Sequence, residues 1–534
     1  MRIATREETY RRKWRALGLH AGRTIAEEIA LASARNPGLA LHFSSGGRET
    51  PVTFAEIAAE SLTHAAGLAA LGLRQGDRMM VQAPHSRDNM ILFAAAMALG
   101  LVVVPVVGIY GSAELSYIAG RTGARAIAVP GQWRDVDHAG RIRAIEPDSS
   151  LETVITLGEP GSREYGLPSV PFGSLEGVAF DPPAISPNDP AVIIFTSGST
   201  GQAKGVVHTH ETAMAELRAA SPFIDQLATR TLLSPLPTGH IAGIMALLRP
   251  FIHAMPTVYL DHWSVPEAVR LINEHGVGWT YGTPFHISGL IDASADTPMP
   301  TFKACQCGGA GVPGSLIERA GRARIAACRS YGSTEQPTIT ANLPNSPLQK
   351  RINSDGPAMP GVEIRLVTED GRTAAPGEPG EIVCTGAEQF VGYLDESENQ
   401  GAFDEEGWFR TGDIGVADEE GYIRIVDRKK DIIIRGGENI ASREVEDEVM
   451  RHPRVLEAAA VGVPDEIYGE RVAAVVILRE GTLDLAELKD QFAKAGLAIQ
   501  KVPERLFIIS DLPRTPLGKI AKQQLREMIA RSEF

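Results

Sequence analysis

A run of ten residues, Thr196–Gly205 (TSGSTGQAKG), has the residue types of a phosphate-binding loop. It directly follows the apolar run Ala191–Phe195, which predicts a buried strand. In such a loop glycines let the backbone approach a phosphate closely, hydroxyls donate hydrogen bonds and a lysine supplies positive charge. The run is not a Walker A motif, which requires Gly, Lys and then Ser or Thr, because Ala203 precedes Lys204 and Gly205 follows it. The residue types favour phosphate binding over the alternative, a solvated Ser/Gly loop.

Four further segments carry charged and hydroxyl residues suited to nucleotide chemistry. In chain order they are YGSTEQ (Tyr331–Gln336), WFRTGDIG (Trp408–Gly415), DRKKDIIIRGGENIASREVE (Asp427–Glu446) and PRTPLGKI (Pro513–Ile520). Together with the Ser/Gly loop, they resemble the core motifs of the adenylate-forming superfamily, in its acyl- and aryl-CoA synthetase branch. The position before the loop lysine is usually proline in that family and is Ala203 here. This departure removes no phosphate-binding group.

The resemblance implies that the protein uses ATP and Mg²⁺ to activate a carboxylic acid as an acyl-adenylate. A thiol, with coenzyme A as the expected acceptor, then takes the acyl group. The first step is in-line attack of the carboxylate on the α-phosphate with pyrophosphate leaving, so the site must stabilise charge on both reacting groups. Hard divalent cations take carboxylate oxygens and bridge phosphates, which suits Glu335, together with Thr200, as the expected Mg²⁺ ligands.

The same resemblance implies the residues that hold the nucleotide. Thr334 corresponds to the contact with the α-phosphate, and Tyr331 to a ring packed on the adenine. Asp413 corresponds to the acceptor for both ribose hydroxyls, assisted by Arg428. The full implied set is Thr196, Ser197, Ser199, Thr200, Lys204, Gly309, Ala310, Tyr331, Gly332, Asp413 and Arg428.

The acyl group is expected to enter a pocket gated by His240, in LPTGHIAGI, where the family places a histidine or an aromatic residue. The alternative is a structural histidine. The implied pocket residues are His240, Tyr281, Gly282, Thr283, Pro284, Gly308 and Gly311. Small residues there leave room for a bulky or ring-shaped acyl group, and the overall resemblance to ligases for such acids implies a medium-chain, alicyclic or aromatic acid. The sequence does not name that acid.

The C-terminal motifs imply the remaining roles. Lys519 is expected to reach the α-phosphate and carboxylate oxygens as the catalytic lysine, the alternative being one more surface lysine. Family members rotate the C-terminal domain between the two half-reactions about a hinge residue that corresponds to Lys430. The thiol tunnel of the second conformation is expected at Gly436, Gly437 and Glu438, where the alternative is a tight turn before a helix. The implied catalytic set is Lys519, Thr334, Glu335 and His240.

The pattern of predicted strands and helices that position these groups indicates an α/β fold with mixed, mostly parallel sheets. Short β-branched runs alternate with longer Ala/Leu/Glu-rich stretches, the pattern of strand–helix–strand units. Residues 149–189 are rich in Gly, Pro and Ser and predict a connection. The predicted strands include Ala126–Pro130, Ala191–Phe195, Thr257–Leu260 and Val277–Tyr281, and the predicted helices include Phe54–Leu71, Thr212–Ser221 and Pro266–His275.

The pattern changes after about residue 350. Short, turn-punctuated strands over residues 361–427 predict a small antiparallel β subdomain. From Asp431 a strand, the helix Ser442–Arg451, two further strands and the helix Leu485–Ala495 predict an α+β domain that ends in a basic tail. We therefore expect an N-terminal adenylation body over residues 1–429, with the acyl and ATP sites, and a small mobile C-terminal domain over residues 430–534.

Composition and charge narrow the class of protein. The net charge of −14 argues against a general nucleic-acid or membrane-surface binder, since both need a basic face. Met90–Val107 runs 18 residues without a charge, but Gly100 divides it into a predicted buried helix and a predicted buried strand. The N-terminus shows no secretory signal, so a cytoplasmic protein is expected. The chain has four cysteines, and their spacing is not that of a zinc site. We predict that they are small buried residues in a reducing compartment: Cys305, Cys307, Cys328 and Cys384.

Two other functions remain open from the sequence. The first is a stand-alone adenylating enzyme that loads a separate carrier protein, because the chain has no appended carrier domain. The second is an inactive nucleotide-binding scaffold, against which the intact set Lys204, Glu335, Asp413 and Lys519 counts. A homodimer is a common habit of the family, and nothing in the sequence locates its interface.

Overall fold

The computed structural model of the chain describes residues 10–145, 149–158, 164–175, 177, 181–196, 203–435, 438–495, 497–514 and 519–533. The chain divides into two compact units. The first comprises Met1–Glu363 and Thr385–Phe409, and the second comprises Ile364–Cys384 and Arg410–Phe534. The predicted domain boundary between residues 429 and 430 stays a prediction.

The first sheet of the N-terminal unit is parallel from β8 to β7, and β9 and β18 extend it with antiparallel pairing. Its strands are short and β-branched, as expected where helices cover both faces. In spatial order they are β18 (Gly392–Tyr393), β9 (Lys204–Thr209), β8 (Pro190–Thr196), β4 (Val102–Pro105), β3 (Arg78–Val81), β5 (Ala126–Pro130), β6 (Thr153–Leu157) and β7 (Ser169–Pro171).

The second sheet is parallel in its centre and antiparallel at both edges. In spatial order its strands are β15 (Thr340–Ala341), β14 (Ala326–Tyr331), β13 (Ala304–Cys307), β12 (Trp279–Gly282), β10 (Leu232–Ser234), β11 (Thr257–Leu260), β1 (Ala40–Ser45) and β2 (Arg48–Thr53). Because β10, β12, β13 and β14 run in the same direction, the segments that follow them leave the same edge of the sheet.

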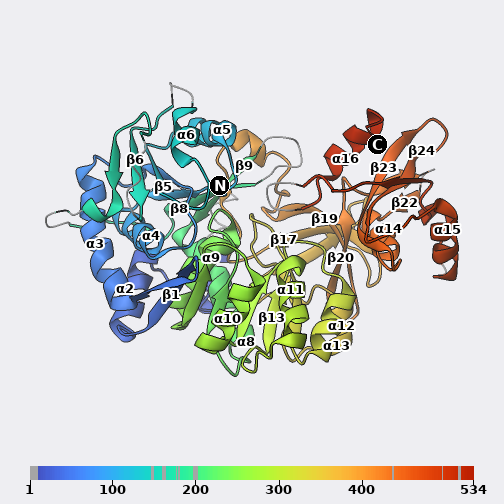
Figure 1. The fold of residues 1–534 in the computed structure, drawn as a ribbon, viewed down its shortest axis with the longest axis horizontal. Helices are drawn as coiled ribbons and strands as arrows, with labels where there is room; N and C mark the ends of the chain where they lie inside the picture. The colour runs from blue at the N-terminus through green and yellow to red at the C-terminus, as the bar shows by residue number, and fades with distance from the viewer. Residues whose placement is uncertain are drawn as a thin grey trace. The chain divides into compact units, whose positions relative to one another are not determined.

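Helices separate and cover the two sheets (Figure 1). Met79 and Val81 of β3 join a core with Leu41 and Phe43 of β1, so this core fills the space between the sheets. Met80, on the opposite face of β3, joins the core beneath α5 and α6. The helices of this unit include α2 (Ile25–Arg35), α3 (Phe54–Ala70), α4 (Arg87–Leu99), α5 (Ser112–Thr122), α6 (His138–Arg143), α7 (His210–Ala219), α8 (Ser221–Ile224), α9 (Ile241–His253), α10 (Val265–His275), α11 (Pro284–Asp296), α12 (Gly314–Arg322) and α13 (Leu348–Asn353).

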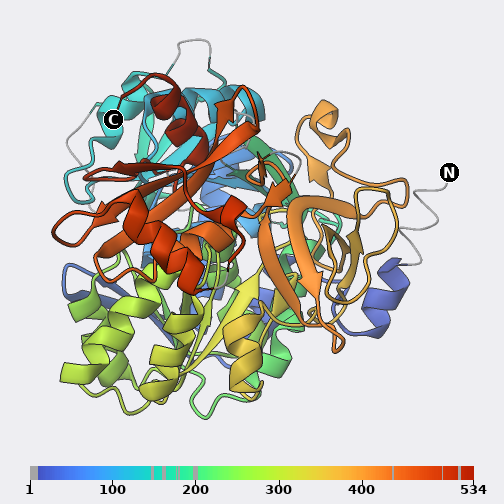
Figure 2. The ribbon, with the colours of Figure 1, turned by 90° about the vertical axis from the view of Figure 1, so that its right-hand side faces the viewer.

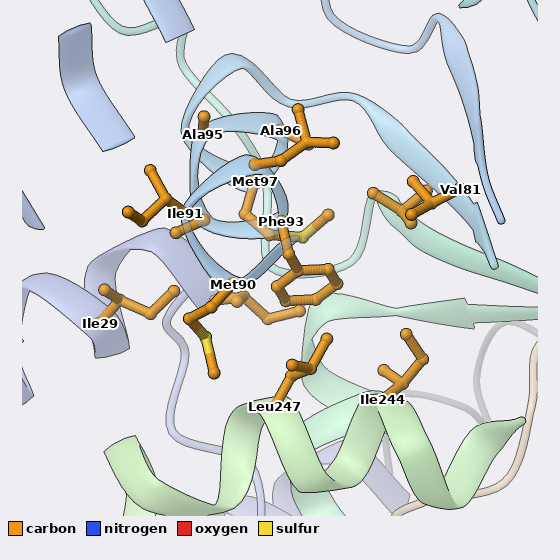
Figure 3. Packing of buried hydrophobic residues seen from close by; sticks show 14 of the residues in the cluster. Ile29, Val81, Met90, Ile91, Phe93, Ala95, Ala96, Met97, Ile244 and Leu247 are labelled. Atoms are coloured by element: carbon orange, nitrogen blue, oxygen red, sulfur yellow. The ribbon is translucent and has the colours of Figure 1, made fainter. Parts of the chain in front are cut away.

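The uncharged segment that has the length of a membrane span is a core helix and a core strand. α4 begins at its N-cap Ser86 and ends at Gly100, whose φ of 76° gives the left-handed turn into β4. Met90 and Phe93 point toward Leu247 and Ile244 of α9 (Figure 3). Within the described residues, no helix combines the length and apolar character that a membrane crossing needs. The predicted division at Gly100 is confirmed.

The second unit begins with a small antiparallel sheet, whose curved strands are orange in Figure 2. Its order is β16 (Glu363–Val367), β17 (Pro379–Thr385), β19 (Phe409–Ala417) and β20 (Ile423–Arg428). The C-terminal sheet has the order β22 (Glu438–Ile440), β21 (Ile433–Arg435), β24 (Gly469–Leu478) and β23 (Val455–Asp465), and β25 (Arg505–Ile508) pairs in parallel with β24.

Successive apolar side chains of β23 and β24 point to opposite faces of the C-terminal sheet, which explains why helices cover both faces. Ala458 and Ala460 pack with α14 (Ser442–Val449) and α15 (Leu485–Lys494), whereas Val461 and Val463 pack with α16 (Lys522–Ala530). Figure 1 shows α15 and α16 on opposite sides of these strands. The predicted strand–helix order of this domain is present, with helix and strand ends shifted by a few residues.

One prediction about a connecting segment was wrong. Residues 149–189, predicted as a connection, contain β6 and β7, which extend the first sheet. The flanking Gly and Pro residues obscured these short strands in the sequence. β6 is stabilised by pairing with β5, and β7 by pairing with β6. The basic tail contains α16, whose Leu525 and Ile529 are buried at helical spacing. The buried state predicted for the four cysteines is confirmed, and none of these four described residues forms a disulfide.

Two fully enclosed histidines predict a loss of stability in acid. Burial lowers the pKa of His85 and of His208 to about 4. Between about pH 6.5 and 4 the unfolded chain therefore binds more protons than the folded chain, and the free energy of unfolding falls as the pH falls. From pH 7 to 5 we expect a loss of about 2 kcal/mol for each histidine. In urea denaturation at these two pH values His85→Gln should lose less than the wild type; equal losses would contradict the prediction.

Candidate active site

The Ser/Gly loop connects two antiparallel strands of the first sheet. Thr196 ends β8 and lies directly opposite Lys204, the first residue of β9. The hydroxyl of Tyr117, on α5, donates a hydrogen bond to the carbonyl of Ala203 at 2.9 Å. Thr196 and Lys204 are thus brought together at the base of the loop. Ser197, Ser199 and Thr200 lie outside the described residues.

Lys204 and Glu335, predicted from separate motifs, are linked by a residue that the sequence analysis missed. Lys204 Nζ lies 4.7 Å from the centre of the Tyr393 ring, and the Tyr393 hydroxyl donates to Glu335 Oε1 at 2.8 Å. Burial and the adjacent Glu335 carboxylate raise the pKa of Tyr393, so the phenol stays a hydrogen-bond donor. Tyr393 reaches this position because its strand, β18, pairs with β9 and places Tyr393 opposite Val206, two residues after Lys204.

The backbone of Thr334 and Glu335 is held from two sides. His208 Nε2, on β9, donates to the Thr334 carbonyl at 2.8 Å, and the Phe390 amide donates to the Glu335 carbonyl at 2.8 Å. Because the pKa of His208 is lowered to about 4 by burial, its ring is neutral and its Nδ1 accepts from the Thr212 hydroxyl at 3.1 Å. The Thr334–Glu335 turn is therefore fixed relative to the strand that carries Lys204.

Gly332 shows why the turn after β14 needs a glycine. A Cβ at this position would lie 2.0 Å from the carbonyl oxygen of Pro337. The chain therefore folds back closely on itself directly after Tyr331, the last residue of β14. Tyr331 is partly buried and pairs with Thr340 on β15.

The two glycine-containing segments predicted for the acyl pocket lie side by side. β12 and β13 are neighbours, with Gly282 opposite Cys307, and the Gly308 amide donates to the Gly282 carbonyl at 3.1 Å. A Cβ on Gly308 would lie 2.7 Å from Ser330 Oγ on β14, so the three strand ends pack closely. Gly309, Ala310 and Gly311 follow on the surface.

Thr283 and Pro284 also begin α11. Thr283 is its N-cap, and its hydroxyl lies 2.8 Å from His286 Nδ1. Pro284 occupies the first turn, where its missing N–H is not needed. These contacts account for both residue types through helix capping, and their role in an acyl pocket stays a prediction.

His240 is the N-cap residue of α9. The preceding Gly239 permits a close approach, because a Cβ there would lie 2.5 Å from the Val107 Cα. His240 follows β10, whose neighbour β12 carries Tyr281. The Tyr281 hydroxyl is 3.0 Å from Ser234 Oγ on β10, and burial raises the pKa of Tyr281 to about 12. His240 and Tyr281 are thus carried by segments that leave the same edge of the second sheet as Thr334.

A buried charge network lies next to Tyr281. The Arg249 guanidinium pairs with Glu216 at 3.2 Å and lies 5.8 Å from the centre of the Tyr281 ring. Glu216 also accepts from the Thr338 hydroxyl at 3.1 Å, and Glu388 accepts from the Thr338 amide at 3.3 Å. Burial, and then repulsion from Glu216, raises the pKa of Glu388 well above its usual value. No periodicity or motif in the sequence predicts this network.

In the second unit the predicted ribose residues are paired. Asp413 on β19 lies opposite Arg428 on β20, and Arg428 Nε is 3.2 Å from Asp413 Oδ1. The Asp413 amide donates to Thr411 Oγ1 at 3.1 Å. The Asp413 side chain is 9% exposed and that of Arg428 is 52% exposed, so the carboxylate is largely buried and the paired guanidinium faces solvent.

The other predicted residues of this unit lie at turns and strand ends. Lys430 lies in a turn that the Asp431 amide closes onto the Arg428 carbonyl at 2.8 Å. Asp431 pairs with Arg526 on α16 at 2.9 Å. Lys519 and Glu438 are exposed. Gly436 and Gly437 lie outside the described residues.

Comparison with known proteins identifies the family. A family model described as AMP-binding enzyme matches residues 30–394, and one described as AMP-binding enzyme C-terminal domain matches residues 444–519. The chain belongs to the AMP-binding enzyme family. Among AMP-binding enzymes it lies in the acyl-CoA synthetase branch, so the predicted family is confirmed.

Its relatives within the AMP-binding enzymes act on different acids. The medium-chain fatty-acid–CoA ligase of Escherichia coli is 32% identical over 491 residues, 88% of this chain and 85% of that protein. The sulfoacetate–CoA ligase of Cupriavidus necator is 32% identical over 507 residues, 94% and 97% of the two chains. The structure of O-succinylbenzoate coenzyme A synthetase from Bacillus subtilis with ATP and a magnesium ion has a TM-score of 0.80, 26% identity and coverage of 93% and 99%. The predicted α/β fold class is confirmed.

Proposed function

We propose that this enzyme joins a medium-chain, alicyclic or aromatic carboxylic acid to coenzyme A through an acyl-adenylate. One observation carries the proposal: the predicted acyl-pocket segments and the predicted α-phosphate segment follow the neighbouring strands β12, β13 and β14 at one edge of one sheet. A carboxylate bound beside Gly282 and Gly308 would lie next to a phosphate bound at Thr334. Attack of one on the other then requires no large movement of either substrate.

The residues of the N-terminal unit have complementary tasks in this reaction. Lys204 offers positive charge to the phosphates at the base of the Ser/Gly loop, and the Thr334 hydroxyl donates to the α-phosphate. Mg²⁺ bound with ATP supplies charge neutralisation at the phosphates. Glu335 fits as a ligand because one carboxylate oxygen is oriented by the Tyr393 hydroxyl, and the loop hydroxyl of Thr200 is the expected second ligand.

The residues of the second unit complete the proposal. Asp413 accepts hydrogen bonds from the ribose hydroxyls with Arg428 beside it, and Lys519 stabilises the charge that develops during attack on the α-phosphate. Rotation about Lys430 then exchanges Lys519 for the segment that includes Gly436, Gly437 and Glu438, which leads the thiol to the adenylate.

A single assay tests both the reaction and the acid class. Pyrophosphate release is measured with Mg·ATP across linear, alicyclic and aromatic acids, with and without coenzyme A. We expect release with one acid class and a sharp rise in turnover on adding coenzyme A. Release that is indifferent to coenzyme A would point to a carrier protein as acceptor. Absence of release across the panel would favour the inactive nucleotide-binding alternative.

Removing one hydroxyl tests the orientation of the expected Mg²⁺ ligand. In Tyr393→Phe, Glu335 loses its hydrogen bond to the phenol, and we expect the apparent KM for Mg·ATP in adenylation to rise roughly tenfold, as for loss of one hydrogen bond to a charged group. Steady-state adenylation at varied Mg²⁺ measures it. Tyr422→Phe, at the residue directly before β20, is the control and should match the wild type. An unchanged Mg²⁺ dependence in Tyr393→Phe would remove Tyr393 from the site.

A further inference from the structure

A polar cluster at the far edge of the second sheet has no role in the reaction described above. β1 and β2 form a hairpin whose turn contains Gly46 and Gly47, with φ of 57° and 77°. In its register Ser44 lies opposite Glu49, and His42, two residues before Ser44, projects from the same face. Leu41 and Phe43 project from the other face into the central core. The hairpin therefore carries an imidazole and a carboxylate on one side.

The last residue of α10 brings a second imidazole to this face. His275 Nε2 lies 2.7 Å from Glu49 Oε2, and His42 Nδ1 lies 3.7 Å from the same oxygen. The centres of the two imidazole rings are 4.4 Å apart. One ligand atom from each of the three residues lies within 4.8 Å of the others. Neighbouring ligand atoms in a tetrahedral zinc site are about 3.3 Å apart, so small side-chain rotations suffice to close the set.

The charges around the three side chains favour a dication. Arg270 Nη1 lies 3.1 Å from Glu49 Oε1 and leaves Oε2 to the two histidines. Arg270 also pairs with Glu267 at 2.6 Å and with Glu274. Three carboxylates thus face one guanidinium, and His275 stands at the C-terminal end of a helix, where positive charge is stabilised.

We propose that His42, Glu49 and His275 form a binding site for one Zn²⁺ ion, with water as the remaining ligand. Two imidazoles and a carboxylate are ligands of borderline metals such as zinc, whereas Mg²⁺ prefers oxygen ligands. The side chains of His42, Glu49 and His275 are 31%, 21% and 19% exposed, so the ion can enter from solvent and its site is partly buried. β1 lies five strand spacings, roughly 24 Å, from β14 and the predicted α-phosphate segment. The ion would join the edge hairpin to α10 and take no part in adenylation.

Metal binding to the full chain tests the site directly. The protein is freed of any histidine tag, stripped with a chelator and dialysed against Zn²⁺ without nucleotide, and the bound metal is counted. We expect one Zn²⁺ per chain and a rise in melting temperature, both unaffected by excess Mg²⁺. His42→Gln, Glu49→Gln and His275→Gln should each weaken binding by roughly 10- to 100-fold or more and abolish the temperature shift. Co²⁺ should give the absorption bands of a tetrahedral site with nitrogen and oxygen ligands in the wild type alone.

His452→Gln is the matched control. His452 lies 3.8 Å from Glu487 in the second unit, a histidine–glutamate contact without a second imidazole at the same oxygen. This variant should bind Zn²⁺ like the wild type. A wild-type protein that takes up no Zn²⁺ at micromolar concentrations would overturn the proposal. Equal stoichiometry and affinity in the wild type and in the three cluster variants would also overturn it, since the metal would then sit elsewhere.

Discussion

Replacing Lys519 by alanine is expected to slow adenylate formation by about 10²–10³-fold, the effect of removing one donor that acts in a transition state. Thioester formation from a preformed acyl-adenylate should be retained. The reason is positional: the ammonium group stabilises the negative charge on the α-phosphate oxygens while the carboxylate attacks, and the proposed rotation about Lys430 removes it from the site before the thiol attacks the acyl carbon.

Each half-reaction needs its own assay. Adenylation is followed by acid-dependent exchange of labelled pyrophosphate into ATP, and thioester formation by mixing synthetic acyl-adenylate with coenzyme A in single turnover. Lys489→Ala, which changes an exposed lysine on α15, is the control and should leave both rates intact. Equal losses in the two half-reactions of Lys519→Ala would refute a role confined to adenylation.

Replacing Lys430 by proline is expected to separate the half-reactions in the opposite way. Proline fixes φ near −65° and restricts the preceding residue, so the Arg428–Asp431 turn can no longer change its backbone conformation. If the C-terminal domain rotates about this turn, adenylation should proceed at a rate within a few-fold of the wild type. Thioester formation should fall by a factor on the order of 10² or more, as for a misplaced reacting group.

Lys430→Ala isolates the backbone effect from the side chain. It removes the same ammonium group but leaves φ free, so both half-reactions should continue. The melting temperatures of the two variants are compared to exclude loss of folding. Intact thioester formation in Lys430→Pro would remove this turn as the hinge, and equal losses in Lys430→Ala would assign the effect to the side chain.

The elements of the fold that pair or pack locally were predictable from the sequence. Ala126–Pro130 was predicted with the bounds of β5, because a continuous apolar run between turn residues marks a strand covered on both faces. Asp413 and Arg428 could be paired as a ribose site from their motifs, and the β19–β20 register explains that pairing. β6 and β7 were missed because their stability comes from neighbouring strands rather than from their own composition.

The parts of the candidate site that were missed depend on contacts between distant segments. No motif in the sequence around Tyr393 indicates a role in the site. Its contact with Glu335 exists only because β18 pairs with β9. His208 is similarly inconspicuous in VVHTH, and its function as a support for Thr334 follows from burial and from a hydrogen bond across 126 residues of sequence. Motifs identify groups that touch a ligand, whereas the residues that orient those groups are found only in the folded chain.

The most direct test of the account follows the oxygen atoms of the substrate. In the proposed mechanism a carboxylate oxygen bonds to the α-phosphorus, and the thiol then attacks the acyl carbon and releases AMP with that oxygen. A substrate acid labelled with ¹⁸O in its carboxylate should therefore transfer one labelled oxygen to AMP, detected by mass spectrometry after turnover with Mg·ATP and coenzyme A. Label that appears in inorganic phosphate or pyrophosphate, or unlabelled AMP accompanying thioester formation, would contradict an acyl-adenylate intermediate.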